Sequence, residues 1–304
     1  MEAALRNRLT YGSIMLLGLI ALLCLDHYAQ QWTISPAIPH GIGGIGLLVI
    51  CLAMLPPATR ELASLFAAVQ VKPYRLISWI GSSALAIHAF ATQFPRFQPY
   101  STSTLAFIIV FVMIFAALRR AWSRQTHEAI HDMAGTVLAT MYVGGLAWFL
   151  LALRVKDSPR FQGSTMTVLT VLMIVKSTDV GAYFGGKALG RHKLIPWLSP
   201  GKTWEGLFCG MATASLVGAA CAIGMNISCF GWWKGLIFGA VIGVIGQGGD
   251  LLESLMKRDA AVKDSGALIP GFGGVLDVID SPLLAAPFAY LMFSFFAQQL
   301  PALP

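Results

Sequence analysis

Apolar residues dominate the 304-residue sequence and fall into runs close to the roughly 20 residues that a helix needs to cross the core of a bilayer. Short polar connections separate these runs, and no polar stretch is long enough to form a separate soluble domain. The pattern predicts an all-α fold, a polytopic transmembrane helical bundle of about nine spans. We expect the spans at about 11–25, 40–55, 75–92, 103–121, 133–153, 164–185, 205–225, 232–249 and 283–299.

Two features near the start of the chain refine this prediction. The first run follows Arg6 and Arg8 but lacks a small-residue cleavage site after it, so we expect an uncleaved first span rather than a signal peptide. Pro56 and Pro57 are expected to end the second helix, because proline lacks the amide hydrogen that a helix interior needs. The segment 60–71 is then either an amphipathic helix on the membrane surface or a solvated connector.

Charged residues are scarce, at 12% of the chain against 56% hydrophobic residues, and they give a net charge of +7. Lys and Arg recur in alternate connections. Their usual bias toward the cytoplasm predicts an inside N-terminus, with the charged stretch 248–281 on the cytoplasmic side. Arg154, Lys156 and Arg160 contradict that topology, because they would lie outside. The basic residues form no patch with interleaved aromatic residues, so we expect no nucleic-acid partner.

The segment from His127 to His131 matches the pattern HExxH, which on a helix places two imidazoles on one face for zinc and supplies a glutamate as general base. Alone, it would indicate a membrane zinc metalloprotease. No third ligand is evident apart from the neighbouring Asp132, and short patterns of this kind also arise by chance. A solvated helix start is the favoured interpretation.

A polar turn with the sequence SPGKTWEG, at 199–206, precedes the seventh run. It resembles the end of a phosphate-binding P-loop, but Pro196 stands where the first glycine is required, so that interpretation fails. Amides at a helix start are suited to phosphate, and a plain helix cap beside a surface lysine explains the turn equally well. Its candidate substrate-binding residues are Ser199, Lys202, Thr203 and Glu205.

Polar residues also interrupt the apolar run at 164–185. Lys176, Asp179 and Tyr183 are spaced by three and four, which places them on one face of a helix. A buried pair of Lys176 with Asp179 would be purely structural. The other interpretation, which the sequence leaves open, is that Asp179 contacts substrate.

The densest charge lies in 248–281, before the last apolar run. Asp250, Ser254 and Lys257 recur at i, i+4 and i+7 and so share one helical face. A glycine-rich turn follows, and Asp277 and Asp280 open the last helix. Carboxylates from two helices with lysines around them are suited to Mg²⁺ and phosphate oxygens, so we expect Asp250 and Asp277 to share one Mg²⁺.

This stretch resembles the signature of the phosphatidate cytidylyltransferases, also called CDP-diacylglycerol synthases. The residues in register with that signature are Ser254, Met256, Lys257, Arg258, Lys263, Asp264, Gly266, Ile269, Pro270, Gly273, Gly274, Val275, Asp277 and Asp280. The resemblance extends upstream to 177–183 and 199–206, and so covers about 175–281. Two positions depart from the signature, since Phe272 replaces a histidine and Val278 replaces an arginine.

The resemblance implies a reaction of CTP with phosphatidate that gives CDP-diacylglycerol and pyrophosphate. It implies Mg²⁺ as cofactor, with a second cation as an option, and Asp250, Asp277 and Asp280 as metal ligands. The catalytic set that it implies is Lys257, Arg258, Lys263 and Asp264. The substrate-binding set is Asp179, Ser199, Lys202, Thr203, Glu205, Ser254, Gly273 and Gly274.

The same resemblance implies a homodimer in the inner, cytoplasmic membrane, with the active site facing the cytoplasm. We expect one integral membrane domain over 1–304, in which the spans within 1–160 form a scaffold and 170–282 carries the catalytic motifs. Phe272 and Val278 lack the imidazole and guanidinium groups of the signature. They leave open a paralogue with a different lipid acceptor or with weakened activity.

Overall fold

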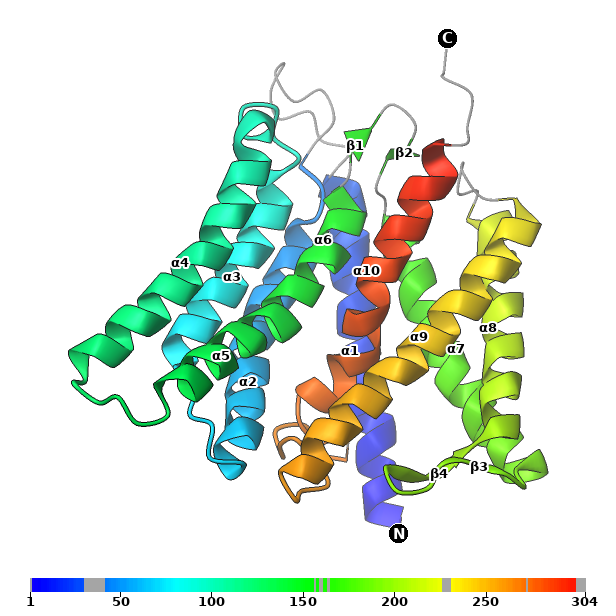
Figure 1. Ribbon diagram of the computed structural model, residues 1–304. Coiled ribbons are helices and arrows are strands. Elements are labelled where there is room, and N and C mark those ends of the chain that lie inside the picture. The colour runs from blue at the N-terminus through cyan, green and yellow to red at the C-terminus, as the bar shows by residue number, and fades with distance from the viewer. Residues whose placement is uncertain are drawn as a thin grey trace. The chain divides into compact units, whose positions relative to one another are not determined.

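The structure, a computed structural model, describes residues 2–29, 42–155, 157–158, 161–162, 165–225, 231–271 and 273–298 (Figure 1). This part of the chain is mostly helical. The α-helices are α1 (Glu2–Ala29), α2 (Ile45–Ala68), α3 (Arg75–Ala91), α4 (Ser101–Trp122), α5 (Ala129–Thr140), α6 (Leu146–Val155), α7 (Thr165–Leu189), α8 (Trp204–Gly224), α9 (Trp232–Asp259) and α10 (Leu276–Gln298).

Shorter elements complete the described chain. The 3₁₀ helix η1 (Gln98–Tyr100) precedes α4, and the π-helix η2 (Met141–Gly145) joins α5 to α6. Two antiparallel hairpins are formed by β1 (Asp157–Ser158) with β2 (Phe161–Gln162) and by β3 (Lys193–Ile195) with β4 (Ser199–Thr203).

Seven helical stretches within the described ranges are long and apolar enough to cross a membrane. They are α2, η1 with α4, α5 with η2 and α6, α7, α8, α9 and α10. The two other predicted spans, 11–25 and 75–92, are also helical but fall short of that criterion. α1 contains only a shorter apolar stretch, Leu17–Tyr28, and α3 has 17 residues. The predicted all-α, polytopic membrane fold is confirmed, with a number of spans close to the expected nine.

The prediction that Pro56 and Pro57 end the second helix is wrong. α2 continues through both prolines to Ala68, so most of the segment 60–71 belongs to the same helix. The Thr59 hydroxyl donates to the carbonyl oxygen of Pro56 at 3.0 Å, and the residues around the two prolines are largely buried. Packing against neighbouring helices and side-chain hydrogen bonds of this kind allow proline inside a membrane helix.

Contacts divide the chain into two compact units, which are described separately. The first unit comprises Met1–Val155 and Asp259–Val278, and the second comprises Lys156–Arg258 and Ile279–Pro304. Along the C-terminal part of the chain, the boundaries between the two units fall at the last residue of α9 and within the first turn of α10. The expectation of one integral membrane domain, with a scaffold in 1–160 and catalytic motifs in 170–282, stays a prediction.

In the first unit, α3 packs against α2, α4, α5 and α6. A buried histidine joins three of these helices. Trp148 Nε1 of α6 donates to His88 Nδ1 of α3 at 2.9 Å, and His88 Nε2 lies 2.8 Å from the carbonyl oxygen of Ser101 at the start of α4. Because Nδ1 accepts, the proton lies on Nε2, so His88 is neutral and donates to Ser101.

Arg154 explains one exception to the predicted topology. Its side chain is 1% exposed, and its Nε lies 2.6 Å from Asp26 Oδ2 of α1. The other carboxylate oxygen of Asp26 accepts from the amide of Gly46 at 3.3 Å. The buried pair is electrically neutral, so Arg154 is not a solvated positive charge in a connection. Lys156 and Arg160 lie outside the described residues.

In the second unit, α7 and α8 pack as an antiparallel pair, and the β3–β4 hairpin connects them (Figure 1). Thr203, at the end of β4, caps α8, because its hydroxyl accepts from the amide of Gly206 at 3.1 Å. α8 packs closely on α9, where a Cβ on Gly218 would clash with the carbonyl oxygen of Gly235. This packing fixes the hairpin beside the polar end of α9.

Candidate active site

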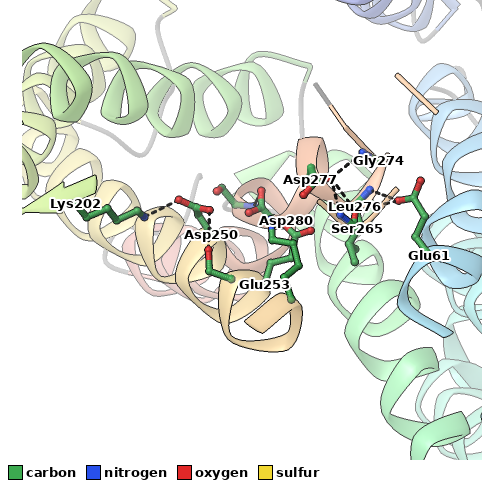
Figure 2. Close-up of polar contacts among 12 residues, drawn as sticks. Glu61, Lys202, Asp250, Glu253, Ser265, Gly274, Leu276, Asp277 and Asp280 are labelled. Carbon is green, nitrogen blue, oxygen red and sulfur yellow. Dashed lines mark hydrogen bonds and ion pairs between the residues drawn. The ribbon is translucent and has the colours of Figure 1, made fainter. Parts of the chain in front are cut away.

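A lysine of the β3–β4 hairpin connects α9 with α7 through a chain of polar groups. Lys202 Nζ lies 2.7 Å from Asp250 Oδ2 of α9 (Figure 2). It also donates to Gln247 Oε1 at 2.9 Å. Gln247 Nε2 in turn donates to Asp179 Oδ1 of α7 at 2.9 Å. The structure therefore brings the predicted residues Asp179, Lys202 and Asp250 together. Gln247, which the sequence interpretation missed, links them.

This chain of groups is only partly shielded from solvent. The Lys202 side chain is 17% exposed, and those of Asp179 and Asp250 are each 40% exposed. Lys176 lies 3.7 Å from Asp179 and is 56% exposed, so the two residues pair as their spacing allows, but the pair is not buried. A partly exposed ammonium group held by a carboxylate and an amide can exchange these partners for the oxygens of a phosphate.

Glu253 of α9 is a buried acidic residue that the sequence interpretation did not select. Its side chain is 1% exposed, and its Oε2 lies 3.5 Å from Lys257 Nζ. It also lies beside Asp280 of α10 and interacts with it electrostatically (Figure 2). The spacing of four between Glu253 and Lys257 was the available signal, since such residues lie one helical turn apart. Ser254 Oγ lies 3.5 Å from Asp250 Oδ1, as their shared face predicts.

Together these groups form what we call the lysine–carboxylate cluster of the second unit. Its members are Asp179, Asp250, Glu253 and Asp280 with Lys176, Lys202 and Lys257. Four carboxylates thus lie among three ammonium groups, and Asp250 and Asp280 repel each other electrostatically. A cation that joined the cluster would reduce this repulsion.

In the first unit, the loop before α10 holds the carboxylate of Asp277. Its Oδ2 accepts from the amide of Gly274 at 2.7 Å, the amide of Ser265 at 3.1 Å and the hydroxyl of Ser265 at 2.9 Å (Figure 2). Gly273 has a φ of +101°, which glycine adopts without the steric cost of a Cβ, and it forms an antiparallel bridge with Ile269. We call residues 264–271 and 273–277 the amide-held loop. It brings together the predicted residues Gly273, Gly274 and Asp277.

Glu61 of α2 is a second acidic residue that the sequence interpretation missed. Its carboxylate accepts from the amides of Val275 at 3.0 Å and Leu276 at 2.9 Å, at the end of the amide-held loop. The available signal was its position in an apolar helix, because ionisable groups at membrane depth are usually functional. The expected break at Pro56 and Pro57 had instead placed Glu61 in a surface segment.

Three residues of the predicted catalytic set lie outside the lysine–carboxylate cluster. Arg258, at the end of α9, is exposed, and its Nε lies 3.5 Å from the carbonyl oxygen of Leu198. Lys263 and Asp264 are exposed in the connection before α10. Their exposure leaves them accessible to a substrate, and their assigned roles stay predictions.

The other predicted substrate-binding residues lie in the hairpin and in the first turn of α8. Ser199 begins β4, and Glu205 Oε1 accepts from the amide of His192 at 3.2 Å and lies 2.6 Å from His192 Nδ1. These contacts, like the cap at Thr203, give each residue a structural role. Val278, which replaces the arginine of the signature, is half-buried in α10, whereas Phe272 lies outside the described residues.

The HExxH segment does not form the geometry of a zinc site. Glu128 has a φ of +56° and precedes the first residue of α5, so His127 and His131 do not share one face of a continuous helix. Asp132, the third candidate ligand, is paired with Arg120 at 3.1 Å. Both histidines are exposed, which agrees with a solvated helix start.

No group of three or more His, Cys, Asp or Glu side chains is arranged to hold a metal ion in the part of the chain that the structure describes. Mg²⁺ usually takes only one or two protein carboxylates and completes its shell with phosphate oxygens and water. The mutually repelling carboxylates of Asp250 and Asp280 fit that requirement. The expectation that Asp250 and Asp277 share one Mg²⁺ stays a prediction.

The chain is similar to several known proteins. The sequence model described as the cytidylyltransferase family matches residues 7–296. A phosphatidate cytidylyltransferase of Brucella suis is 31% identical over 84% of this chain and 87% of that relative, and one of Bacillus subtilis is 30% identical over 77% and 86%. The Escherichia coli protein YnbB, described as uncharacterized, is 39% identical over 50% of this chain and 49% of its own length.

Proposed function

The chain belongs to the cytidylyltransferase family, and from this premise we propose that it is a phosphatidate cytidylyltransferase. Relatives with that name match over more than three quarters of the chain. The contact that supports the proposal most directly is the ion pair of Lys202 with Asp250. It joins an ammonium group suited to phosphate with a carboxylate suited to a metal, in a protein whose helices are apolar enough to lie in lipid.

In the proposed reaction, an oxygen of the phosphatidate phosphate attacks the α-phosphorus of CTP. The bond from this phosphorus to the β-phosphate oxygen breaks, and pyrophosphate leaves with the electron pair. Phosphate monoesters are largely ionised near neutral pH, since their second pKa is about 6. The site therefore needs to align the reactants and neutralise charge, and a strong general base is unnecessary.

The chain supplies this charge neutralisation from its lysines. Lys202 would release Asp250 and bind a phosphate oxygen, because a phosphate carries more negative charge than one carboxylate. Lys257, held by Glu253, lies on the same helix as Asp250 and would attract the phosphates of CTP. Arg258 and Lys263, both exposed, are assigned to the leaving pyrophosphate or to the lipid phosphate.

We assign Mg²⁺ to Asp250 and Asp280, with Asp277 as the further ligand that the signature predicts. When bound, Mg²⁺ would neutralise charge on the α-phosphate and the leaving oxygen. Release of Asp250 by Lys202 makes one carboxylate oxygen available to the ion. We therefore expect that phosphate binding by Lys202 strengthens Mg²⁺ binding by Asp250, and that Mg²⁺ binding strengthens phosphate binding in turn.

We further propose that the protein is a homodimer in the inner membrane with its active site facing the cytoplasm. The excess of Lys and Arg in the connections that carry the motifs supports this orientation. It would let soluble CTP enter from the cytoplasm while the acyl chains of phosphatidate stay in the bilayer.

The test is pyrophosphate release from CTP and Mg²⁺ by detergent-purified protein, with phosphatidate or with diacylglycerol, which lacks the phosphate. We expect release only with phosphatidate, and a loss of about 100-fold or more in Asp277→Asn, as is typical when a charge-stabilising group is removed. The proposal would be contradicted if Asp277→Asn released pyrophosphate as fast as the wild type, or if release were equal with phosphatidate and with diacylglycerol. Thermal unfolding of both proteins controls for misfolding.

The departure from the signature at Val278 favours one second candidate, a cytidylyltransferase with a different lipid acceptor. Without the guanidinium, the first turn of α10 lacks a group that would bind an anion through two parallel hydrogen bonds. If phosphatidate is inactive, the same assay with other phosphorylated lipids would separate a changed acceptor from a loss of activity. Turnover with one of these lipids alone would identify the second candidate.

A further inference from the structure

Glu61 contacts the loop that carries Asp277, although more than 200 residues separate them in sequence. Its Oε1 accepts from the amide of Val275 and its Oε2 from the amide of Leu276, at 3.0 and 2.9 Å (Figure 2). The hydroxyl of Ser265 lies 3.4 Å from the same Oε2. One carboxylate from α2 therefore accepts two hydrogen bonds at the end of the amide-held loop and lies close to Ser265 near its beginning.

The two amides that Glu61 accepts from lie at the beginning of α10. The first amides of a helix have no acceptor within the helix, and the helix dipole favours a negative charge beside them. Such amides are usually capped by a side chain from the residue just before the helix. Here Val275 and Leu276 are capped from a distant helix, so the cap also fixes the start of α10 onto α2.

Two glycines of the signature make room for this carboxylate. A Cβ on Gly266 would lie 2.6 Å from Glu61 Oε1, and a Cβ on Gly274 would lie 2.5 Å from Glu61 Oε2. Both distances are shorter than real Cβ contacts. The approach of Glu61 thus leaves no room for a Cβ at Gly266, and at Gly274 a Cβ is excluded by Glu61 together with Ser265 Oγ, which would lie closer still.

Glu61 and Asp277 act on the same short segment from opposite sides. Asp277 Oδ2 accepts from the amides of Ser265 and Gly274, and Glu61 accepts from the next two amides, of Val275 and Leu276. The Ser265 hydroxyl is closer to Asp277, at 2.9 Å, than to Glu61, at 3.4 Å, so its proton belongs mainly to the bond with Asp277. A loop held by both carboxylates has little freedom to move Asp277.

We infer that Glu61 is a positioning residue of the active site, which holds the amide-held loop so that Asp277 presents its carboxylate in one orientation. The inference deepens the proposed function, because it rests on Asp277 as a ligand of the divalent cation. Glu61 itself has both oxygens committed to the loop and is not assigned to substrate or metal. Groups that orient a metal ligand typically change metal affinity or activity by about 10- to 100-fold when they are replaced.

The first arm of the test uses hydrogen–deuterium exchange of the metal-free, full-length protein in detergent. In Glu61→Gln the side-chain amide has one acceptor oxygen where the carboxylate has two, so one of the two amides loses its bond. We expect at least one of the amides of Val275 and Leu276 to exchange about tenfold faster, which corresponds to a loss of about 1.4 kcal/mol of local protection. Amides of α7 and α8 should not change.

The second arm measures Mn²⁺ binding by electron paramagnetic resonance, with Asp277→Asn as the reference for loss of that ligand. We expect Glu61→Gln to bind Mn²⁺ about tenfold more weakly and to lower kcat about tenfold, with the KM for CTP within about twofold. Glu61→Asp keeps the charge on a shorter side chain and should recover part of both losses. Arg60→Gln changes the exposed neighbour on α2 and is the matched control.

Unchanged exchange in a folded Glu61→Gln protein would overturn the inference, and so would faster exchange with unchanged Mn²⁺ affinity. If Glu61→Gln does not fold, Glu61→Asp is measured in its place, and the same outcomes apply. A wild-type protein that binds Mn²⁺ but does not turn over CTP would refute the proposed function alone. The exchange and Mn²⁺ arms would still decide the role of Glu61.

Discussion

The lysine–carboxylate cluster and the amide-held loop both contain aspartates of the signature, but the two regions neutralise these charges differently. In the cluster, ammonium groups on long side chains face the carboxylates, and Lys202 and Asp250 are partly exposed. In the loop, Asp277 and Glu61 are bonded mainly to backbone amides. An ammonium group can turn to a new partner by changing its rotamer, whereas an amide can do so only if the backbone moves.

This difference indicates that the two regions have different roles in binding substrate and cation. The cluster is suited to exchange its partners when phosphate and cation arrive, because both sides of each ion pair gain a better partner. The loop is suited to keep one carboxylate in place throughout, because its hydrogen bonds are short-range and fixed by glycine backbone conformations. Replacements in the cluster should therefore have larger and more ligand-dependent effects than replacements of single bonds in the loop.

The largest effect is expected for Asp250→Asn, which removes the charge that Lys202 and the cation both need. We expect pyrophosphate release to fall by about 100-fold or more, the typical cost of removing a charge-stabilising group. The matched control is Asp259→Asn, at the exposed end of the same helix. Similar losses of pyrophosphate release in both variants would mean that any negative charge on α9 matters, and that the ion pair of Asp250 with Lys202 has no special role.

An intermediate effect is expected for Lys202→Met. The variant loses a charge-assisted hydrogen bond to phosphate, worth about 1.5–3 kcal/mol, so kcat/KM should fall by about 10- to 100-fold. Because the ammonium would bind the substrate, the KM for CTP or phosphatidate should rise, unlike in Glu61→Gln. Steady-state kinetics against Lys187→Met, an exposed lysine at the end of α7, measures this difference. An unchanged KM for both substrates would refute the exchange of partners.

The smallest effect is expected for Ser265→Ala in the amide-held loop. Asp277 would lose the hydroxyl at 2.9 Å but keep the amides of Ser265 and Gly274, so the cost is that of one hydrogen bond, about 1 kcal/mol. We expect kcat to fall about fivefold, and the exposed Ser64→Ala serves as the control. A loss as large as that of Asp250→Asn would show that the hydroxyl does more than hold Asp277.

Local patterns in the sequence predicted the helices and much of the cluster. Long apolar runs predicted the membrane helices, because a span must be apolar along its whole length. The spacing of Asp250 and Ser254 predicted their shared face. A helix cap was one of the two interpretations of the polar turn before α8, and the structure shows that Thr203 forms it. The register of the signature placed Asp277 beside a glycine-rich turn, and the family match confirmed the resemblance. These features depend on neighbours within one or two helical turns.

Other features depended on partners that are distant in sequence. Pro56 and Pro57 predicted a helix end, but packing around α2 keeps the helix intact and carries Glu61 to its contacts. Gln247 gains a role only because the hairpin brings Lys202 to it across 45 residues. The HExxH pattern did not form a zinc site because α5 begins within it, so the two histidines do not lie on one continuous helix.

The sequence by itself determined most of the helical segments, which of them can lie in lipid and where the signature aspartates fall, although it placed the end of α2 too early. The hydrophobicity of a segment and the periodicity of a helix depend on neighbouring residues, so both can be predicted from the sequence. Only the tertiary structure decided which group neutralises each carboxylate, whether a lysine, a glutamine or a backbone amide. The physical reason is that a carboxylate in an apolar protein must find donors wherever the fold supplies them, and those of Glu61 lie more than 200 residues away.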